Sequence, residues 1–458
     1  MTDFRIQKDS LGDVSVPVDA LYGAQTQRAV DNFHISGIPM PEQFIASLGM
    51  IKAAAAGANA DLGLLQSTLA EGIIAAALSI SQGDHHEHFP VDVFQTGSGT
   101  STNMNANEVI ATLAAQQLGQ AVNPNDHVNC SQSSNDVIPT AIHVSAELAL
   151  ENSLLPAIAD LTSAIAKREE SAAGLIKTGR THLMDAMPIS VAQELSGWRA
   201  QLTLAAQRID NTRPQLRQLA QGGTAVGTGV NADPKFAGLF CSHLNTHLNK
   251  DSEHLFEPAD NYFAAIASQD IAVALSGQLK SLAAALLKIA NDLRWMNSGP
   301  LTGLADLRLK ALQPGSSIMP GKVNPVIPEA VAMAAAQVIG NDTTITMGGQ
   351  SGNFQLNVML PVIAHNLLQS ITLLTNSCKA LAENCIADFV INTDSIEASL
   401  ANNPILVTAL NSEIGYSASA QIAKQAYAQK RPILEVAAEM TDIPRARLLQ
   451  LLNPENLV

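Results

Sequence analysis

The sequence has few cysteines, little positive charge and no long apolar run. Its four cysteines form no CxxC pair, so the chain has neither an iron–sulfur nor a zinc motif and we expect free thiols. Lysine and arginine number 26 against 41 acidic residues. This excess of negative charge repels nucleic acid and anionic membrane surfaces, so an anionic substrate must be bound by local donors.

No stretch reaches the roughly 18 uninterrupted apolar residues that a membrane-spanning helix needs. The N-terminal sequence MTDFRIQKDS carries charges where a signal peptide needs an apolar core. We therefore expect a cytoplasmic protein with no membrane partner. Apolar residues still make up 47% of the 458 positions, which is typical of a globular chain with a large core and two to four domains.

The pattern along the chain changes twice. The first part mixes short extended pieces with Ala-rich helical runs at 47–59 and 69–81, and the middle part has long helices separated by loops at 178–188, 221–234 and 312–326. The last part returns to short helices with Asn and Pro breaks. The sequence predicts a mainly α fold of three domains, with a long central helical bundle, at residues 1–136, 137–389 and 390–458.

One of the long helices shows a seam with a 3.5-residue period, formed by Leu275, Leu279, Leu282, Leu286, Ile289, Leu293 and Met296. A seam of this kind is more often plain intramolecular core than an oligomer contact. The faces beside it are rich in alanine, which lets other helices approach on several sides. This Ala-flanked length favours an oligomeric bundle.

The loop LQPGSSIMPGKVNPV at 312–326 is the most informative segment. Gly315 and Gly321 permit unusual backbone angles while three prolines fix theirs, so the segment should be a shaped loop that presents two serines and Lys322. Elaborate loops inside helical sequence are usually functional.

Four loops in all concentrate short polar donors, at 96–103, 131–136, 179–182 and 316–324. Hydroxyls and amides at this density suit carboxylate oxygens, which accept several hydrogen bonds each. Helix capping is the alternative for any one of them. His182, in the third loop, is the best titratable candidate near neutral pH.

Three other motifs are weaker. The run 84–88, Asp-His-His-Glu-His, has residues that can bind metal, but its spacing resembles no established site and a solvated loop is the preferred interpretation. The glycines at 222–229 lack a preceding strand and a GK[ST] ending, so we interpret them as an interhelical turn. The segment 124–127 is either a small anion loop or a turn.

The motif GSSIMPGKVNP at 315–325 resembles the signature of the fumarase/aspartase superfamily. Further segments resemble class II (iron-independent) fumarate hydratases, so the resemblance spans nearly the whole chain: ALYGAQTQRAV, FQTGSGTSTNMNANEV, SQSSND, GRTHLMDAMP, GGTAVGTG and LNVMLPVIAHN. It implies a three-domain α fold, a homotetramer built on a twenty-helix core, and active sites assembled from three subunits. The implied reaction is reversible hydration of fumarate to L-malate, with no metal or organic cofactor.

The resemblance also implies roles for particular residues. Ser316 is the base that takes the C3 proton of malate, and His182 is the acid, working through a bound water and oriented by Glu329. The implied substrate-binding residues are Ser98, Gly99, Thr100, Ser133, Ser134, Asn135, Thr181, Ser317, Lys322 and Asn324. An accessory anion site is expected at Asn123, Pro124, Asn125 and Asp126, although families of this kind usually have His where Asn123 stands.

Two alternatives remain open. Aspartase, the ammonia-lyase branch of the superfamily, is suggested by NPVIPEA and by Asn123–Asp126, but aspartases commonly have Gln at the position of His182 and Ala at that of Gly321. A non-catalytic role is the second alternative, because the superfamily includes lens proteins that lost activity.

Overall fold

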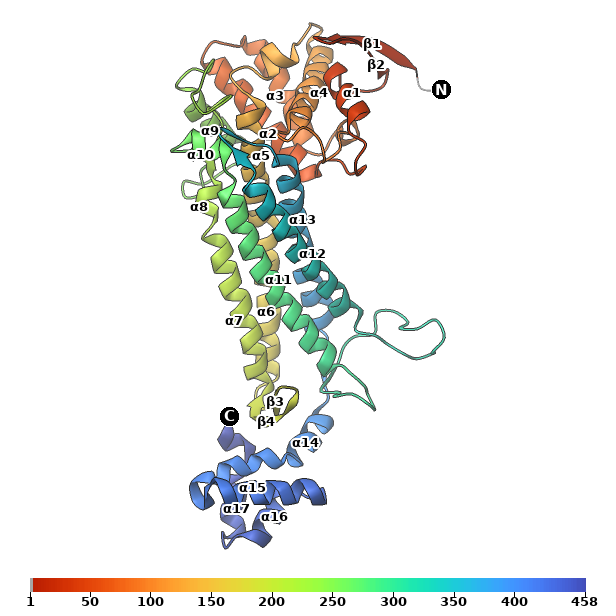
Figure 1. The fold of residues 1–458 in the computed structure, drawn as a ribbon, viewed down its shortest axis with the longest axis vertical. Coiled ribbons are helices and arrows are strands. Elements are labelled where there is room, and N and C mark those ends of the chain that lie inside the picture. The colour runs from red at the N-terminus through yellow and green to blue at the C-terminus, as the bar shows by residue number, and fades with distance from the viewer. Residues whose placement is uncertain (1–2) are drawn as a thin grey trace. The chain divides into compact units, whose positions relative to one another are not determined.

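The computed structural model describes residues 3–458 and is mainly helical (Figure 1), which confirms the predicted fold class. The chain forms two compact units. The first contains Met1–Pro156, Ala206–Ala283 and Ala336–Thr375; the second contains Ala157–Ala205, Ala284–Ala335 and Asn376–Val458. Long helices pass from one unit into the other: α7 (Val191–Asp210), α11 (Asp270–Met296), α12 (Val326–Gly349) and α13 (Leu360–Leu381). The division into three domains stays a prediction.

Helix α2 lies at the centre of the first unit and packs on α3, α5 and α9. Its alanines, Ala53–Ala56, are buried, and small side chains let neighbouring helices approach closely. A Cβ on Gly49 of α2 would lie 2.5 Å from the carbonyl oxygen of Ala77 on α3. The predicted helical runs at 47–59 and 69–81 lie within α2 and α3, and the helices of this region are α1 (Ala24–Asn32), α2 (Glu42–Asp61), α3 (Ser67–Ser81), α4 (Thr100–Leu118), α5 (Ser134–Ala149), α9 (Phe236–His247) and α10 (Tyr262–Ala267).

The predicted extended pieces near the start form the antiparallel hairpin of β1 (Phe4–Asp9) and β2 (Gly12–Pro17). Other short elements of the first unit connect its helices: η1 (His86–His88), η2 (Pro124–Val128), η3 (Leu150–Leu154), α8 (Arg213–Leu216), β5 (Gln218–Leu219), β6 (Glu257–Pro258), β8 (Gly352–Asn353) and β9 (Leu356–Asn357).

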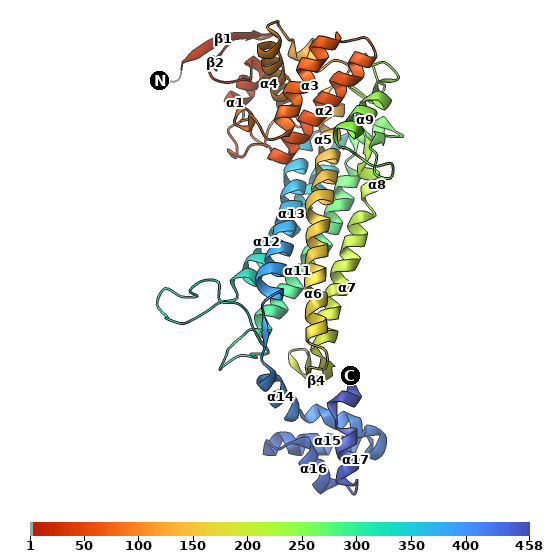
Figure 2. The same ribbon diagram turned by 180° about the vertical axis from the view of Figure 1, so that it is seen from behind.

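The long helices can be followed in Figures 1 and 2, and buried or half-buried polar contacts join neighbouring helices within each unit. In the first unit, Asp342 of α12 accepts hydrogen bonds from Ser276 at 2.8 Å and Lys280 at 2.6 Å, both on α11. In the second unit, the Trp198 indole of α7 donates to Asp292 of α11 at 3.1 Å. These pairs fix the register of neighbouring helices, because a buried polar atom needs its partner.

Helix α11 is long and apolar enough to cross a membrane by length and composition alone. Its seam is nevertheless core: Leu275, Leu279, Leu282, Leu286, Ile289 and Leu293 are fully buried within the single chain. A side chain that is already covered by its own chain cannot contact a second copy. The seam is therefore intramolecular core, which is the more frequent role of such a pattern. The oligomeric bundle favoured by the alanine-rich faces beside it stays a prediction.

The second unit contains α6 (Leu155–Ser171) and the hairpin of β3 (Ile176–Thr181) and β4 (Met184–Ser190). The segment 178–188 was expected to be a loop, and this expectation is wrong. Glycine, two consecutive turn residues and an irregular register hide the period-two alternation by which a strand is normally recognised. The unit also holds a short pair formed by β7 (Leu307–Arg308) and β10 (Val390–Ile391).

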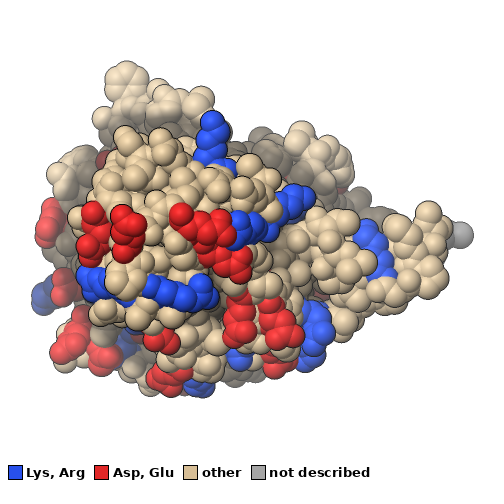
Figure 3. Space-filling model, turned by 90° about the horizontal axis from the view of Figure 1, so that it is seen from below, with Lys and Arg blue, Asp and Glu red and all other residues tan. Residues whose placement is uncertain are grey.

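Short helices follow, as predicted for the last part of the chain: η4 (Ala382–Ile386), α14 (Thr393–Ala401), η5 (Pro404–Leu410), α15 (Asn411–Gln429), α16 (Ile433–Met440), α17 (Arg445–Leu451) and η6 (Pro454–Leu457). From α14 onward they enclose a small core that includes Leu410, Val436 and Leu448. On the face in Figure 3, acidic and basic side chains are interspersed, so this face offers no basic patch for nucleic acid.

Candidate active site

The loop at 312–326 places Ser316 among backbone donors. The Ser316 Oγ accepts hydrogen bonds from the backbone N–H of Ile318 at 3.2 Å and of Met319 at 3.1 Å. Two N–H groups aimed at one oxygen stabilise negative charge there, as in an oxyanion hole. This is the setting that a serine base requires, because its alkoxide is otherwise too unstable to form.

The two ends of this segment are joined. The N–H of Gly315 donates to the Lys322 carbonyl at 2.8 Å, and the Asn324 amide donates to the Gly315 carbonyl at 2.8 Å. A Cβ at Gly315 would lie 2.7 Å from the Lys322 oxygen, so only glycine fits this close approach. The contacts bring Ser316 next to the loop segment that carries Lys322 and Asn324.

Lys322, Asn324 and Glu329 line a pocket of about 880 Å³. Glu329 lies in the first turn of α12, and Arg294 and Arg308 line the same pocket. Ser316 and Ser317 are not among its lining residues. No hydrogen bond or ion pair within residues 3–458 joins Glu329 to a histidine of this chain.

His182 stands at the tip of the β3–β4 hairpin, between the paired residues Thr181 and Met184. His182 and Leu183 have φ angles of 54° and 61°, so both central residues of the turn are left-handed, as in the tight turns that usually take Asn and Gly. Thr181, His182 and Leu183 are exposed. Strained backbone of this kind is concentrated at functional sites.

Replacing Leu183 by asparagine is expected to stabilise the protein by about 1 kcal/mol, because asparagine tolerates a left-handed backbone that costs leucine roughly that much. The check is the urea unfolding midpoint. Leu64→Asn is the control, since Leu64 is also exposed but is not among the residues with positive φ. A lower urea midpoint for Leu183→Asn than for the wild type would contradict the claim that leucine is strained at this left-handed position.

In the first unit, the loops at 96–103 and 131–136 meet. The Asn103 amide donates to the Ser134 hydroxyl at 3.0 Å, and the hydroxyls of Ser98 and Thr100 lie 2.8 Å apart. Gly99 caps α4 with a φ of 71°. The contact between Asn103 and Ser134 joins the two loops. One loop carries Ser98, Gly99 and Thr100, and the other carries Ser133, Ser134 and Asn135.

Capping accounts for part of the second loop. Ser133 is the N-cap of α5, and it forms a capping box with Asp136. Asp136 also accepts the N–H groups of Gly222 at 3.0 Å and Thr224 at 2.9 Å. The glycine-rich run at 222–229 is therefore a turn wrapped on a carboxylate, in agreement with its interpretation as an interhelical turn.

A buried lysine that the sequence reasoning missed lies beneath these loops. Lys52 of α2 is fully buried, and its Nζ donates to Asn129 Oδ1 at 3.1 Å and to Gln132 Oε1 at 3.0 Å. The same Asn129 oxygen accepts the amides of Asn103 at 3.2 Å and Asn107 at 3.1 Å. Lys52 is thus hydrogen-bonded to Gln132 of one polar loop and, through Asn129, is linked to Asn103 of the other. In the sequence, the only sign of this role is a single lysine within the apolar run IKAAAA.

Burial lowers the pKa of Lys52 to about 7 and raises that of Asp136 to about 6. In the unfolded chain Lys52 keeps its proton up to its ordinary pKa of 10.5, whereas the folded protein has released it above about pH 7. Between these values the unfolded state binds more protons, so the stability contributed by Lys52 rises with pH.

We therefore expect the thermal unfolding midpoint of the wild type, relative to Lys52→Met, to rise between about pH 7 and about pH 9. Methionine keeps most of the side-chain length and cannot titrate, so the difference isolates the ammonium group. Scanning calorimetry of both proteins measures it. A difference in midpoint that stays constant or falls over this pH range would refute the lowered pKa of Lys52.

Comparison with known proteins identifies the family. The chain matches the family described as Lyase over residues 12–340 and the one described as Fumarase C C-terminus over residues 406–458. It is 59% identical to "Fumarate hydratase class II 2" of Pseudomonas aeruginosa, an alignment that covers 100% of this chain and 99% of that protein. The chain belongs to the class II fumarate hydratase family.

Other similar proteins and solved structures agree with this assignment. Fumarate hydratase class II of Xylella fastidiosa is 56% identical, over 99% of this chain and 95% of that protein. The crystal structure of class II fumarase from Schistosoma mansoni superposes with a TM-score of 0.96 at 39% identity, and the match covers 99% of each chain. A crystal structure of fumarate lyase:delta crystallin from Brucella melitensis bound to cobalt gives a TM-score of 0.93 at 41% identity, again over 99% of each chain.

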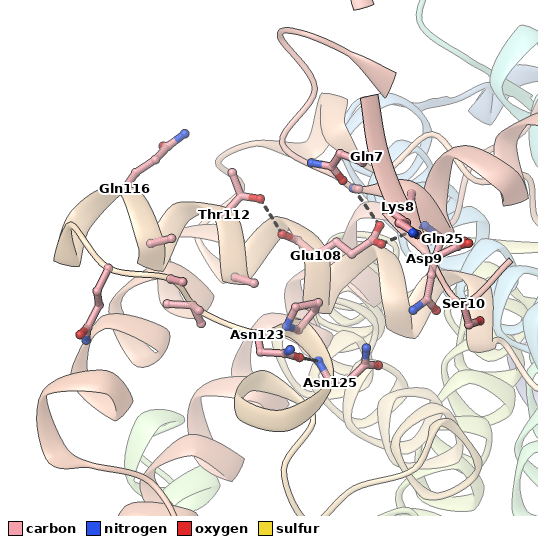
Figure 4. A pocket seen from close by; sticks show the side chains of 18 of the residues that line it. Gln7, Lys8, Asp9, Ser10, Gln25, Glu108, Thr112, Gln116, Asn123 and Asn125 are labelled. Carbon is pink, nitrogen blue, oxygen red and sulfur yellow. Dashed lines mark hydrogen bonds between the residues drawn. The ribbon is translucent and has the colours of Figure 1, made fainter. Parts of the chain in front are cut away.

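The expected accessory anion site of the class II family lies on the turn η2. The Asn123 side-chain oxygen accepts the N–H groups of Asn125 at 2.8 Å and Asp126 at 3.0 Å, so it caps its own turn. Asn123, Pro124 and Asn125 border a pocket of about 900 Å³ whose labelled side chains are mostly amides and hydroxyls (Figure 4). Lys8 is balanced by Asp9 and Glu108 there, so the pocket has no excess of positive charge.

The histidine-rich segment forms a hydrogen-bonded turn. Ligand atoms of His85, Glu87 and His88 lie within 4.8 Å of one another, as a divalent cation would need. However, His88 Nδ1 accepts the N–H of Leu21 at 3.4 Å, its Nε2 lies 3.5 Å from Glu87, and burial lowers its pKa. A neutral ring that accepts through Nδ1 carries its proton on Nε2, so neither nitrogen of His88 offers a free lone pair to a metal ion.

The cysteines are free, as expected. Burial raises the pKa of Cys241, Cys378 and Cys385 to about 12, which makes them unreactive thiols.

Proposed function

We propose that this chain is a fumarate hydratase that interconverts fumarate and L-malate, with Ser316 as the base and His182 as the acid. The observation that carries the proposal is the Ser316 hydroxyl, whose oxygen accepts two backbone N–H groups within the family's signature loop. Full-length identity of 59% to a protein named fumarate hydratase class II supports the same reaction.

Malate loses its C3 proton to the Ser316 oxygen, and the electrons move into the neighbouring carboxylate to form an aci-carboxylate. That intermediate carries extra negative charge, so donors and a cation must already surround it. Lys322 supplies the cation, and Asn324, Ser317 and the hydroxyls of Thr100 and Thr181 supply donors. The amides and hydroxyls at Ser98, Gly99, Ser133, Ser134 and Asn135 bind the substrate carboxylates.

The hydroxyl group leaves from C2 on the opposite face as water. His182 delivers the proton through a bound water, and Glu329 orients the histidine and raises its proton affinity. Because the two groups act from opposite faces, elimination is anti. No metal or organic cofactor is needed, since Lys322 and the donors supply the positive charge.

We also propose a homotetramer whose active sites each draw residues from three subunits, on a twenty-helix core. Within one chain His182 and Glu329 share no hydrogen bond, whereas the proposed mechanism pairs them, which supports a pairing between subunits. Size-exclusion chromatography with light scattering measures the assembly. We propose a cytoplasmic location, which fractionation of the source cells tests.

The reaction is tested by following ultraviolet absorbance of the conjugated double bond of fumarate. We expect absorbance to appear with L-malate and to disappear with fumarate in water. Appearance with L-aspartate instead would replace the hydratase by an ammonia-lyase. If a folded protein gives no absorbance change with fumarate, L-malate or L-aspartate, a structural role would remain.

A further inference from the structure

A buried ion cluster lies at the base of the hairpin that carries His182. The Asp306 carboxylate accepts hydrogen bonds from two guanidinium nitrogens of Arg180, at 2.7 and 2.9 Å. It also forms an ion pair with the Lys177 ammonium at 2.8 Å. Lys177 also contacts Glu194 at 2.8 Å. The side chains of Lys177 and Asp306 are 2% and 5% exposed, whereas those of Arg180 and Glu194 are partly exposed. Two cations and two carboxylates therefore balance around a buried Lys177–Asp306 pair.

The electrostatics favour an ionised Asp306. Burial opposes ionisation, but hydrogen bonds from Arg180 and the charge of Lys177 hold the pKa of Asp306 below its ordinary value. A bidentate arginine–carboxylate contact fixes direction as well as distance. Asp306 therefore determines where the Arg180 side chain points, and Arg180 lies two residues before His182.

The strand needs such an anchor because it is irregular here. The register between β3 and β4 shifts between Thr178 and Arg180, and a Cβ on Gly179 would lie 2.5 Å from the Met187 carbonyl oxygen. A bulge re-aims the residues that follow it. In this hairpin those residues are Arg180, Thr181 and His182.

Asp306 is itself firmly held. Its carbonyl accepts the N–H of Asn392 at 2.9 Å, and the N–H of Ala305 donates to Ser298 at 2.8 Å. Asp306 directly precedes β7, which leads into the loop of Ser316. The opposite edge of the hairpin is clamped by the buried Asn403, whose amide donates to the Ala186 carbonyl at 2.9 Å.

We propose that Asp306 is a positioning residue for the reaction. Through its bidentate contact with Arg180 it fixes the orientation of the bulged hairpin, and with it the positions of Thr181 and His182. The inference rests on the proposed function. It predicts a defect in turnover rather than in substrate binding, because the groups assigned to carboxylate binding lie mainly on other loops.

The test compares Asp306→Asn with the wild type. Asparagine keeps the shape and removes the charge, and we expect kcat for fumarate hydration to fall about 30-fold while KM stays within about threefold, as a displacement near 1 Å can cause. Asp306→Glu restores the charge and should recover part of the loss. The control is Asp342→Asn, which removes another buried aspartate bound to a lysine and a serine hydroxyl.

Because Asp306→Asn leaves two cations facing one carboxylate, it can destabilise the fold. Arg180→Lys is the second variant, because lysine keeps the positive charge but cannot form the bidentate contact with Asp306. We expect kcat to fall about tenfold with an unchanged unfolding midpoint. Turnover within about twofold of the wild type in either folded variant, a rise in KM alone, or an equal loss in Asp342→Asn would overturn the inference. A wild type inactive with fumarate would instead refute the proposed function.

Discussion

Replacement of Ser316 by alanine is expected to lower kcat for fumarate hydration by about 10³-fold, the middle of the range of roughly 10²- to 10⁴-fold for a general base. The variant should assemble normally, because Ser316 lies on an irregular loop and the change removes a hydroxyl rather than core volume. Steady-state kinetics in both directions measure the loss. Both directions should fall equally, since one group removes the proton from malate and returns it to fumarate.

Ser317→Ala is the matched control for this loop. Ser317 is adjacent and exposed, and no described group hydrogen-bonds to its hydroxyl, so a smaller loss that includes a higher KM is expected. Near-normal turnover of Ser316→Ala would remove Ser316 from the base role. Equal losses in the two variants would point to general damage to the loop.

His182→Asn is expected to lower kcat by about 10²-fold and to abolish the limb of the pH–rate profile that reports the acid. Asparagine is the informative substitution, because it suits the left-handed φ of 54° at this position and so keeps the turn intact. The measurement is kcat as a function of pH for both proteins. An unaltered profile would count against His182 as the acid.

The Leu183→Asn variant of the same turn serves as the control for His182→Asn. It changes the neighbouring side chain without removing an ionisable group, so its pH profile should match that of the wild type. If both variants lose the same limb, the geometry of the hairpin rather than the imidazole is responsible.

The sequence predicts much of this fold because its signals are local. The Ala-rich runs become α2 and α3, and the segment around Ser316 is a loop because its glycines and prolines cannot continue a helix. The hairpin around His182 was missed, since a bulge at Gly179 interrupts its alternation. The seam of α11 was identified correctly as a packing face, but its partner could not be read from one helix: any apolar helix face is compatible with core or interface.

The candidate site was predictable where residues sit together in a motif. Lys52 and Asp306 were not, because their importance comes from partners distant in sequence: Asn129 and Gln132 for Lys52, and Lys177 and Arg180 for Asp306. Spacing along a chain carries no information on such contacts. What the chain does contain is a charged residue in otherwise apolar surroundings, as in IKAAAA, and this is the pattern by which a buried partner can be suspected.

Hydration of fumarate in deuterium oxide tests the central claim most directly. A base and an acid acting from opposite faces should yield L-malate that carries one deuterium at C3, in a single configuration, as resolved by proton coupling in the NMR spectrum. Malate with deuterium in both C3 configurations, or aspartate formed from added ammonia in place of malate, would contradict the account.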